Sequence, residues 1–249
     1  MKDTGQRKSA IDQIRQNIVQ RGFHTYVVTG GGDPHYAYTI GLRDSLGAEL
    51  IIAGAYFYKL EEIPQIIDKI VAGLSPETDL KTREIIVDSR GSFSFREVDE
   101  SWVKKLMLGA LDFYQIETMK AWQIVPDESH FTLDIPNMNK PWSAALFPVW
   151  RDLDQEWAYP IPVQSIAITN LGALRGERVT EVMRWENDEW EMFAGASPNV
   201  PADERRVVPI SILLAVDNSL YPAVYLEIGA GLWRDDVSEW NPWGTTAQQ

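Results

Sequence analysis

The sequence contains no cysteine. This absence excludes disulfides, thiolate catalysis, and zinc or iron–sulfur centres held by cysteine. Only three histidines are present, His24, His35 and His130. No apolar run reaches the roughly 18 residues that a membrane span needs, and residues 1–8 lack the apolar core of a signal peptide. The sequence therefore predicts a cytoplasmic protein without a metal or other cofactor, stabilised by packing alone.

Motifs for phosphate binding and nucleophilic catalysis are also missing. Gly30–Gly32 is not followed by the Lys-Ser/Thr of a phosphate-binding loop, so this triglycine predicts a turn. No serine lies in a Gly-x-Ser-x-Gly elbow. His24 and His35 lie on two strands expected to pair, and with Asp33 they are the best candidates for a metal site. A metal needs three or four converging ligands, so neither a catalytic residue nor a metal ligand is predicted.

Basic residues are scarce in the second half of the chain. The net charge is −13; residues 1–125 carry 15 Lys and Arg against 17 Asp and Glu, whereas residues 126–249 carry 8 against 19. A field of this sign repels nucleic-acid phosphate and anionic membranes and attracts a basic partner. An acidic surface can also serve solubility alone. The charge favours a basic protein as the partner over nucleic acid or membrane.

Hydrophobic periodicity predicts an α+β fold with predominantly antiparallel sheets and packed helices. A hairpin is expected around Gly30–Gly32, and a second one at 179–194, where Trp185 and Trp190 would lie near one another across the strands. Residues 49–55 are apolar on both faces, which predicts a central strand. The other expected strands are 83–88, 92–98, 121–125, 163–170 and 225–233. The expected helices are 9–21, 60–74, 102–114 and a short helix within 206–216 that begins after Pro209.

Composition predicts three parts along the chain. Residues 126–162 contain six prolines and three tryptophans and little regular pattern. This connection separates an N-terminal α+β domain (1–125) from an acidic C-terminal α+β subdomain (163–249). Because the connection is aromatic, we expect it to pack against the body of the protein and not to act as a free linker.

Two apolar strands flank a glycine in the motif Tyr38-Thr39-Ile40-Gly41-Leu42, which is followed by Glu49-Leu50-Ile51. Gly22-Phe23-His24 precedes an alternating strand and fits the same pattern. Over about residues 20 to 75 the sequence resembles DUF4262, a bacterial family of unknown function. The resemblance implies no activity and no residue roles. We interpret the motif as a determinant of the fold, in which Gly41 is needed for backbone geometry or close packing.

Ten tryptophans are many for 249 residues. Trp102, Trp122 and Trp185 are expected in the core and in hairpins. The stretch 206–240 resembles the tail of some acidic, Trp-rich bacterial proteins of unknown role, and it mixes tryptophans with carboxylates. Aromatic anchors carry affinity in protein interfaces while charge steers the encounter. The predicted partner-binding residues are Trp233, Asp235, Asp236, Glu239, Trp240 and Trp243.

The leading hypothesis is a non-enzymatic acidic protein that docks or neutralises a basic protein such as a toxin, in the manner of an immunity protein or antitoxin. The alternative is a flavin- or nucleotide-binding enzyme of split-barrel type. The order of the hairpin, the Tyr-Thr-Ile-Gly-Leu strand, the Glu-Leu-Ile strand and a helix is similar to that of the flavin-reductase split barrel. In that alternative the cofactor phosphate would lie near Thr39 and Arg43.

Overall fold

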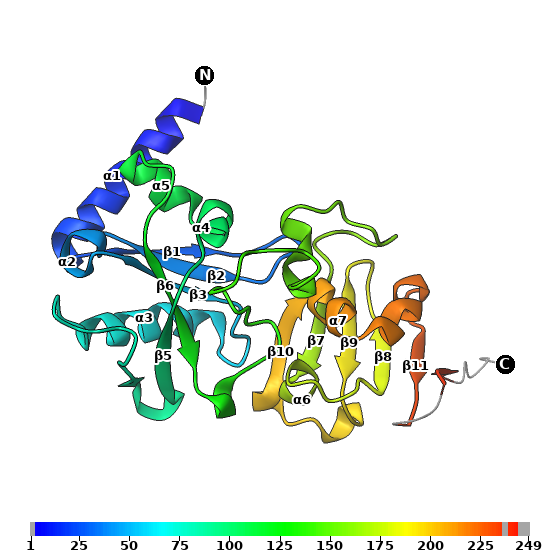
Figure 1. Ribbon diagram of the computed structural model, residues 1–249. Helices are drawn as coiled ribbons and strands as arrows, with labels where there is room; N and C mark the ends of the chain where they lie inside the picture. The colour runs from blue at the N-terminus through cyan, green and yellow to red at the C-terminus, as the bar shows by residue number, and fades with distance from the viewer. Residues whose placement is uncertain (1–2, 236–238, 244–249) are drawn as a thin grey trace. The chain divides into compact units, whose positions relative to one another are not determined.

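The computed structural model describes residues 3–235 and 239–243 (Figure 1). The chain forms two compact units that interleave along the sequence. Unit 1 comprises the described residues up to 28 together with 35–131 and 135–142. Unit 2 comprises 29–34, 132–134 and the described residues from 143 onward. The three-part division expected from composition stays a prediction.

Unit 1 contains a six-stranded sheet in the order β1-β2-β3-β6-β5-β4, in which only the β3–β6 pair is parallel. Its strands are β1 (His24–Val28), β2 (Tyr36–Ile40), β3 (Glu49–Ala53), β4 (Ile85–Ile86), β5 (Ser92–Glu97) and β6 (Ala121–Pro126). All five residues of β3 are buried, because strands flank it on both edges and helices and loops cover its faces. The predicted central strand is thereby confirmed.

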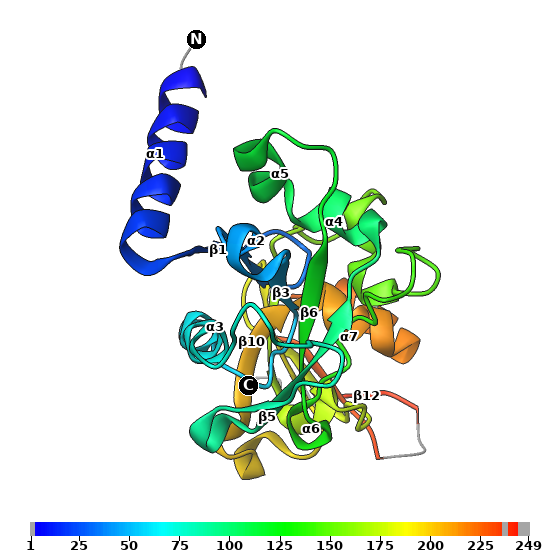
Figure 2. The ribbon, with the colours of Figure 1, turned by 60° about the vertical axis from the view of Figure 1, so that its left-hand side comes forward.

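The longer helices of unit 1 are α1 (Asp3–Arg21), α3 (Ile63–Ala72), α4 (Glu100–Leu106) and α5 (Leu108–Tyr114), and α2 (Arg43–Leu46) is a single turn. Ile63, Ile66, Ile67 and Ile70 of α3 are fully buried in the core. The single helix expected over 102–114 was wrong, since Met107 (φ −105°, ψ 33°) interrupts it. In Figures 1 and 2, α1 extends away from the sheet; Arg7 of α1 pairs with Asp112 of α5 at 2.6 Å.

Unit 2 contains a second six-stranded sheet in the order β10-β7-β9-β8-β11-β12, in which only β7 and β9 are parallel. Its strands are β7 (Ile166–Asn170), β8 (Glu181–Arg184), β9 (Glu189–Phe193), β10 (Arg205–Pro209), β11 (Gly231–Trp233) and β12 (Asn241–Pro242). Its helices include η4 (Pro148–Leu153), α6 (Leu171–Leu174), α7 (Ile210–Val216) and η7 (Asn218–Tyr225). Both sheets are mostly antiparallel and carry packed helices, which confirms the predicted α+β class.

The short helix predicted after Pro209 is confirmed as α7. The periodicity did not predict strand β10, in which Arg205–Pro209 pairs with β7 just before this helix. One prediction for the C-terminal part needs correction. The strand expected over 225–233 is reduced to Gly231–Trp233, since residues up to Tyr225 belong to the helical turns of η7. Throughout the described ranges, no helix combines the length and the apolar character needed to cross a membrane.

Candidate functional site

The family-like motif of unit 1 is organised around the carboxylate of Glu49, which is fully buried. The carboxylate accepts hydrogen bonds from the hydroxyls of Thr39 and Tyr114, both at 2.6 Å. It also accepts them from the backbone N–H groups of Gly41 (2.9 Å), Leu42 (3.3 Å) and Arg43 (3.1 Å). Burial raises the pKa of Glu49, and these hydrogen bonds oppose the rise. The Glu-Leu-Ile strand and the Thr-Ile-Gly-Leu turn are thus joined through one side chain.

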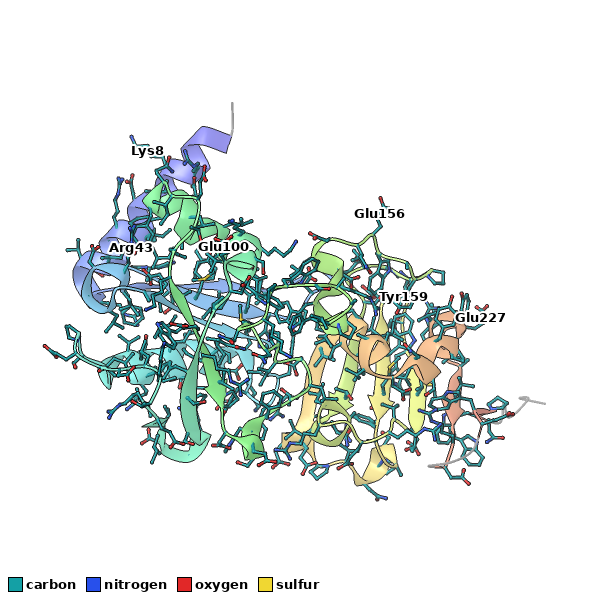
Figure 3. All side chains as sticks on the ribbon, in the orientation of Figure 1. Lys8, Arg43, Glu100, Glu156, Tyr159 and Glu227 are labelled. Atoms are coloured by element: carbon teal, nitrogen blue, oxygen red, sulfur yellow. The ribbon has the colours of Figure 1, made fainter. Side chains whose placement is uncertain are left out.

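The hydrogen bonds of Glu49 occupy the position where the alternative hypothesis places the phosphate of a flavin or nucleotide. Three successive N–H groups form a cradle of the kind that binds anions, but the chain's own Glu49 fills it. Thr39 is fully buried and its hydroxyl also accepts from the N–H of Leu50 at 2.9 Å. Arg43 is exposed, with its guanidinium 5.4 Å from the ring centre of Tyr114 (Figure 3). A cofactor phosphate near Thr39 and Arg43 would have to displace a buried carboxylate, so the geometry favours a structural role for the motif.

Gly41 has φ +119°, a conformation that side-chain-bearing residues rarely adopt. A Cβ at this position would lie 3.0 Å from both the carbonyl oxygen of Gly22 and Cγ1 of Ile18. The glycine is therefore required by backbone conformation and by the close approach of α1 and the chain that leads into β1.

The three histidines lie apart within unit 1. The two candidate metal ligands His24 and His35 do not meet across the hairpin, because the antiparallel register pairs His24 with Ile40 while His35 precedes β2 at the opposite end. His24 contacts Asn17 at 2.8 Å, and His35 packs on Tyr56 with ring centres 4.0 Å apart. Nδ1 of His130 contacts Asp127 at 2.7 Å. Among the residues with described side chains, no cluster of three or more His, Asp or Glu is arranged to hold a metal ion.

The predicted C-terminal residues separate into two groups. Trp233 and Trp243 are exposed (42% and 41%), as are Asp235 and Glu239. Trp240 packs within unit 2, where its ring centre lies 4.0 Å from the guanidinium of Arg234 and its Nε1 donates to the carbonyl of Ser219 at 2.8 Å. Asp236 lies outside the described residues. Of the six, Trp233 and Trp243 are the exposed aromatic ones.

The sheet of unit 2 has two different faces, because side chains alternate along each strand. Val182, Trp190 and Met192 point into the core, and Nε1 of Trp190 donates to the carbonyl of Ala223 in η7 at 3.2 Å. Figure 1 shows the helices of this region, α7 and η7, in orange beside the strands of the sheet. The residues between them, such as Met183 and Glu191, therefore project from the opposite face.

This opposite face carries carboxylates and tryptophans together. The register sets Met183 beside Glu191 and Gly231, and Glu181 beside Trp233. At Gly231 an added Cβ would collide with the ring of Trp243, so the glycine leaves room for that ring over the strand. We call this the acidic-aromatic face; it comprises Glu181, Met183, Trp185, Glu189, Glu191, Trp233 and Trp243.

The face continues onto β7 and β10 as an apolar strip. Ile168 pairs with Glu191 on one side and with Val207 on the other. Val207 is 58% exposed. Exposed apolar groups that adjoin charged ones are typical of protein interaction sites.

A pocket of about 220 Å³ opens in the acidic-aromatic face. Trp185 and Glu191 share one wall, where the indole Nε1 donates to Oε2 of Glu191 at 2.6 Å. Glu181 accepts a hydrogen bond from the N–H of Ser197 at 2.7 Å. The residues that line the pocket are Glu181, Val182, Met183, Trp185, Glu191, Phe193, Ser197, Pro198 and Trp243.

The expected proximity of Trp185 and Trp190 was wrong. Trp190 pairs with Arg184, so Trp185 belongs to the other face and is 46% exposed whereas Trp190 is fully buried. Sequence reasoning also missed Glu181 and Glu191. Charged and apolar residues alternate along both strands of this hairpin. That alternation could have placed the two glutamates on the same exposed face, once the two strands were paired.

A known protein family matches part of unit 1 but does not reach the acidic-aromatic face. Residues 17–131 match the family described as a domain of unknown function (DUF4262), which confirms the resemblance of the Tyr-Thr-Ile-Gly-Leu and Glu-Leu-Ile motif and extends it to β6. No curated protein and no solved structure matches the chain. The match ends before the acidic-aromatic face, so the family assigns no role to that face.

Proposed function

We propose that the protein is a non-enzymatic binding protein of the cytoplasm that docks a basic protein on the acidic-aromatic face of unit 2. A toxin neutralised in the manner of an immunity protein or antitoxin is one such partner. The observation that carries this proposal is the gathering of three exposed tryptophans and three glutamates on one face of a single sheet.

The chemistry of the face matches such a partner. Exposed tryptophans supply the aromatic area on which interface affinity depends, and carboxylates around them steer a basic protein and hold it in register. No ion pair in the described part of the chain involves Glu181, Glu189 or Glu191. Their charge is therefore available to cations from outside the chain.

Affinity capture from cells of the source organism tests the proposal. Tagged wild-type protein is compared with a variant that carries Glu181→Gln, Glu189→Gln and Glu191→Gln, and with a control that carries Glu61→Gln, Glu77→Gln and Glu84→Gln on exposed positions of unit 1. We expect one or more basic proteins to be retained by the wild type and the control and lost from the face variant. Equal capture by all three proteins, or capture of acidic proteins only, would contradict the proposal.

A further inference from the structure

We propose that the pocket of about 220 Å³ in the acidic-aromatic face receives the side chain of a single arginine of the partner. This inference rests on the proposed docking function and names the chemical group that the face recognises. It is carried by the size of the pocket, by its aromatic and acidic walls, and by the placement of Arg205, a cation that lies against one of the lining rings.

The size of the pocket favours one side chain over a small molecule. Clefts that hold drug-sized ligands or cofactors occupy roughly 300–1,000 Å³, and this pocket is smaller. Its open mouth lies on an exposed surface whose neighbouring tryptophans, Trp185 and Trp243, are each more than two-fifths exposed. A side chain that projects from a docked protein therefore has access to it.

The walls offer aromatic and apolar surface together with carboxylate oxygens. Trp185, Trp243 and Phe193 contribute aromatic rings, and Met183 and Pro198 contribute apolar surface. A cation over an aromatic ring is attracted by the quadrupole of that ring, most strongly by tryptophan. Arginine suits such walls better than lysine, because its planar guanidinium stacks on aromatic rings and pairs with carboxylates through several N–H groups.

Two carboxylate oxygens are placed to meet the guanidinium. Glu181 and Glu191 each use Oε2 to accept a hydrogen bond from unit 2, from the N–H of Ser197 and the indole of Trp185. These bonds orient both carboxylates. Oε1 of each takes part in no hydrogen bond with the described residues, so it remains able to accept from a guanidinium.

Arg205, a cation that lies against a ring lining the pocket, does not neutralise these carboxylates. The guanidinium of Arg205 lies 5.3 Å from the ring centre of Phe193. Its Nη2 donates to the carbonyls of Ser197 and Val200, both at 3.2 Å. Arg205 is thus held by backbone carbonyls beside the pocket and forms no ion pair with Glu181 or Glu191.

The test uses three capped tripeptides and the full-length protein. They are Gly-Arg-Gly, Gly-Lys-Gly and Gly-citrulline-Gly, of which citrulline has the shape of arginine without its charge. Binding is followed through the indole N–H signals of the protein by NMR. We expect the arginine peptide to shift the signals of Trp185 and Trp243 saturably, and the citrulline peptide to bind at least ~10-fold more weakly because it lacks the cation. The lysine peptide should bind with intermediate affinity.

Variants assign the effect to the pocket. Glu191→Gln keeps an oxygen that can accept from Trp185 but removes the charge, so we expect the arginine peptide to bind ~10-fold more weakly. Glu227→Gln, on the exposed turn after η7, is the matched control and should leave binding unchanged (Figure 3). The comparison of arginine with citrulline uses wild-type protein, so it stays decisive even where a variant folds poorly.

Equal binding of the arginine and citrulline peptides, or arginine shifts confined to tryptophans outside the pocket, would overturn the pocket assignment. The docking proposal has a separate outcome. If the capture of basic proteins still depends on the three glutamates, docking stands and only the arginine pocket is wrong. If the arginine peptide binds through Glu191 while the three-glutamate variant captures the same proteins as the wild type, the pocket stands and the docking function is wrong.

Discussion

The Glu49 carboxylate is buried and surrounded by five hydrogen-bond donors from three parts of unit 1. Two donors are hydroxyls and three are backbone N–H groups in the turn after β2. Such a carboxylate fixes the turn without any external ligand. At the scale of single residues, the most distinctive sequence motif of this protein therefore serves the fold.

Replacing Glu49 with glutamine should lower the free energy of unfolding by about 2–4 kcal/mol, because an amide NH₂ would face donors that then lose their acceptor. Tyr114→Phe removes one hydroxyl from the same network and should cost about 1 kcal/mol. Urea unfolding followed by circular dichroism measures both values. A cost for Tyr114→Phe equal to or above that for Glu49→Gln would show that the carboxylate is not the centre of the network.

Gly41→Val should lower the free energy of unfolding by about 1–3 kcal/mol, through strain at positive φ and through crowding against Gly22 and Ile18. Gly47→Val is the matched control, since Gly47 also has positive φ but an added Cβ would have no neighbour within 4 Å. Thermal unfolding of the two variants separates strain from crowding. A wild-type melting temperature for Gly41→Val would contradict the role of this glycine as a fold determinant, and if partner binding were lost as well, the motif would be a binding site.

Asp33 should make the stability of unit 2 depend on pH. Burial, with the charge of Asp152 as a second cause, raises the pKa of Asp33 from 3.8 to about 6. Because the folded-state pKa is raised, protonation of Asp33 stabilises the fold; this contribution is complete below about pH 3.8 and is lost as the pH rises through about 6. Compared with Asp33→Asn, the wild type should therefore lose stability as the pH rises through this window.

Thermal unfolding of wild type and Asp33→Asn at a series of pH values tests this. NMR titration gives the pKa directly, and Asp152→Asn should lower the pKa of Asp33 by removing the neighbouring charge. A pKa near 3.8 in the wild-type protein, or parallel stability curves for wild type and Asp33→Asn, would contradict the prediction.

At the scale of secondary structure, the β8–β9 hairpin places some of its side chains in the core of unit 2 and others on the exposed acidic-aromatic face. Trp190 is fully buried against η7, whereas Trp185 is 46% exposed on the acidic-aromatic face. Trp190 pairs with Arg184, the residue just before Trp185. Because successive side chains along a strand point to opposite faces, the two tryptophans lie on opposite sides of the sheet. One stabilises unit 2, and the other is available to a partner.

Trp190→Ala should lower the free energy of unfolding by about 3–5 kcal/mol, as expected for a large side chain removed from a core. Trp185→Ala should change it by less than about 1 kcal/mol, while it weakens the binding of the arginine tripeptide. Chemical denaturation and the NMR titration give the two readouts. A large loss of stability in Trp185→Ala would assign that residue to the core.

At the scale of the whole molecule, the excess of negative charge lies in the second half of the sequence, where the acidic-aromatic face is also found. Charge of one sign raises the association rate of an oppositely charged partner, and salt screens the effect. The exposed carboxylates Asp235 and Glu239, with Asp236 between them in sequence, should contribute to this steering.

Reversing Asp235, Asp236 and Glu239 to lysine should slow the association of an octa-arginine peptide several-fold and weaken the dependence of its rate on salt. Stopped-flow tryptophan fluorescence at several salt concentrations measures the rates. The control reverses Glu61, Glu77 and Glu84 in unit 1, which changes the net charge by the same amount. Equal slowing by both variants would assign the effect to net charge alone and not to this region.

Trp240 marks the limit of local sequence reasoning. Three carboxylates, Asp235, Asp236 and Glu239, lie within the five residues before it in sequence. In the fold its ring lies against Arg234, and its indole donates to the carbonyl of Ser219. The break at Met107 and the β-strand before Pro209 were missed for a similar reason. The N–H of Gly109, just after the break, donates to the hydroxyl of Tyr38, and the strand pairs with β7. Such contacts join segments distant in sequence, whereas periodicity reports only local spacing.

Sequence patterns alone were enough to predict the α+β class, the central strand β3, both hairpins and the acidic character of the second half. These features follow from side-chain periodicity, turn residues and charge, all of which are local properties of the chain. The same patterns also predicted that Gly41 lies in a constrained motif. That Glu49 fills the anion cradle beside Thr39 and Arg43 could not be predicted in this way, because the cradle forms only where β2, β3 and α5 come together in the fold.

The tertiary structure also decided the candidate site. Glu181, Trp185, Glu191 and Trp243 come from three segments of the chain. Only the pairing of β8 with β9 and with β11, and of β11 with β12, brings them to one pocket. Sequence reasoning found the aromatic and acidic character of this part of the protein. It did not find the face, because the sheet register and the side that helices cover decide which residues face solvent.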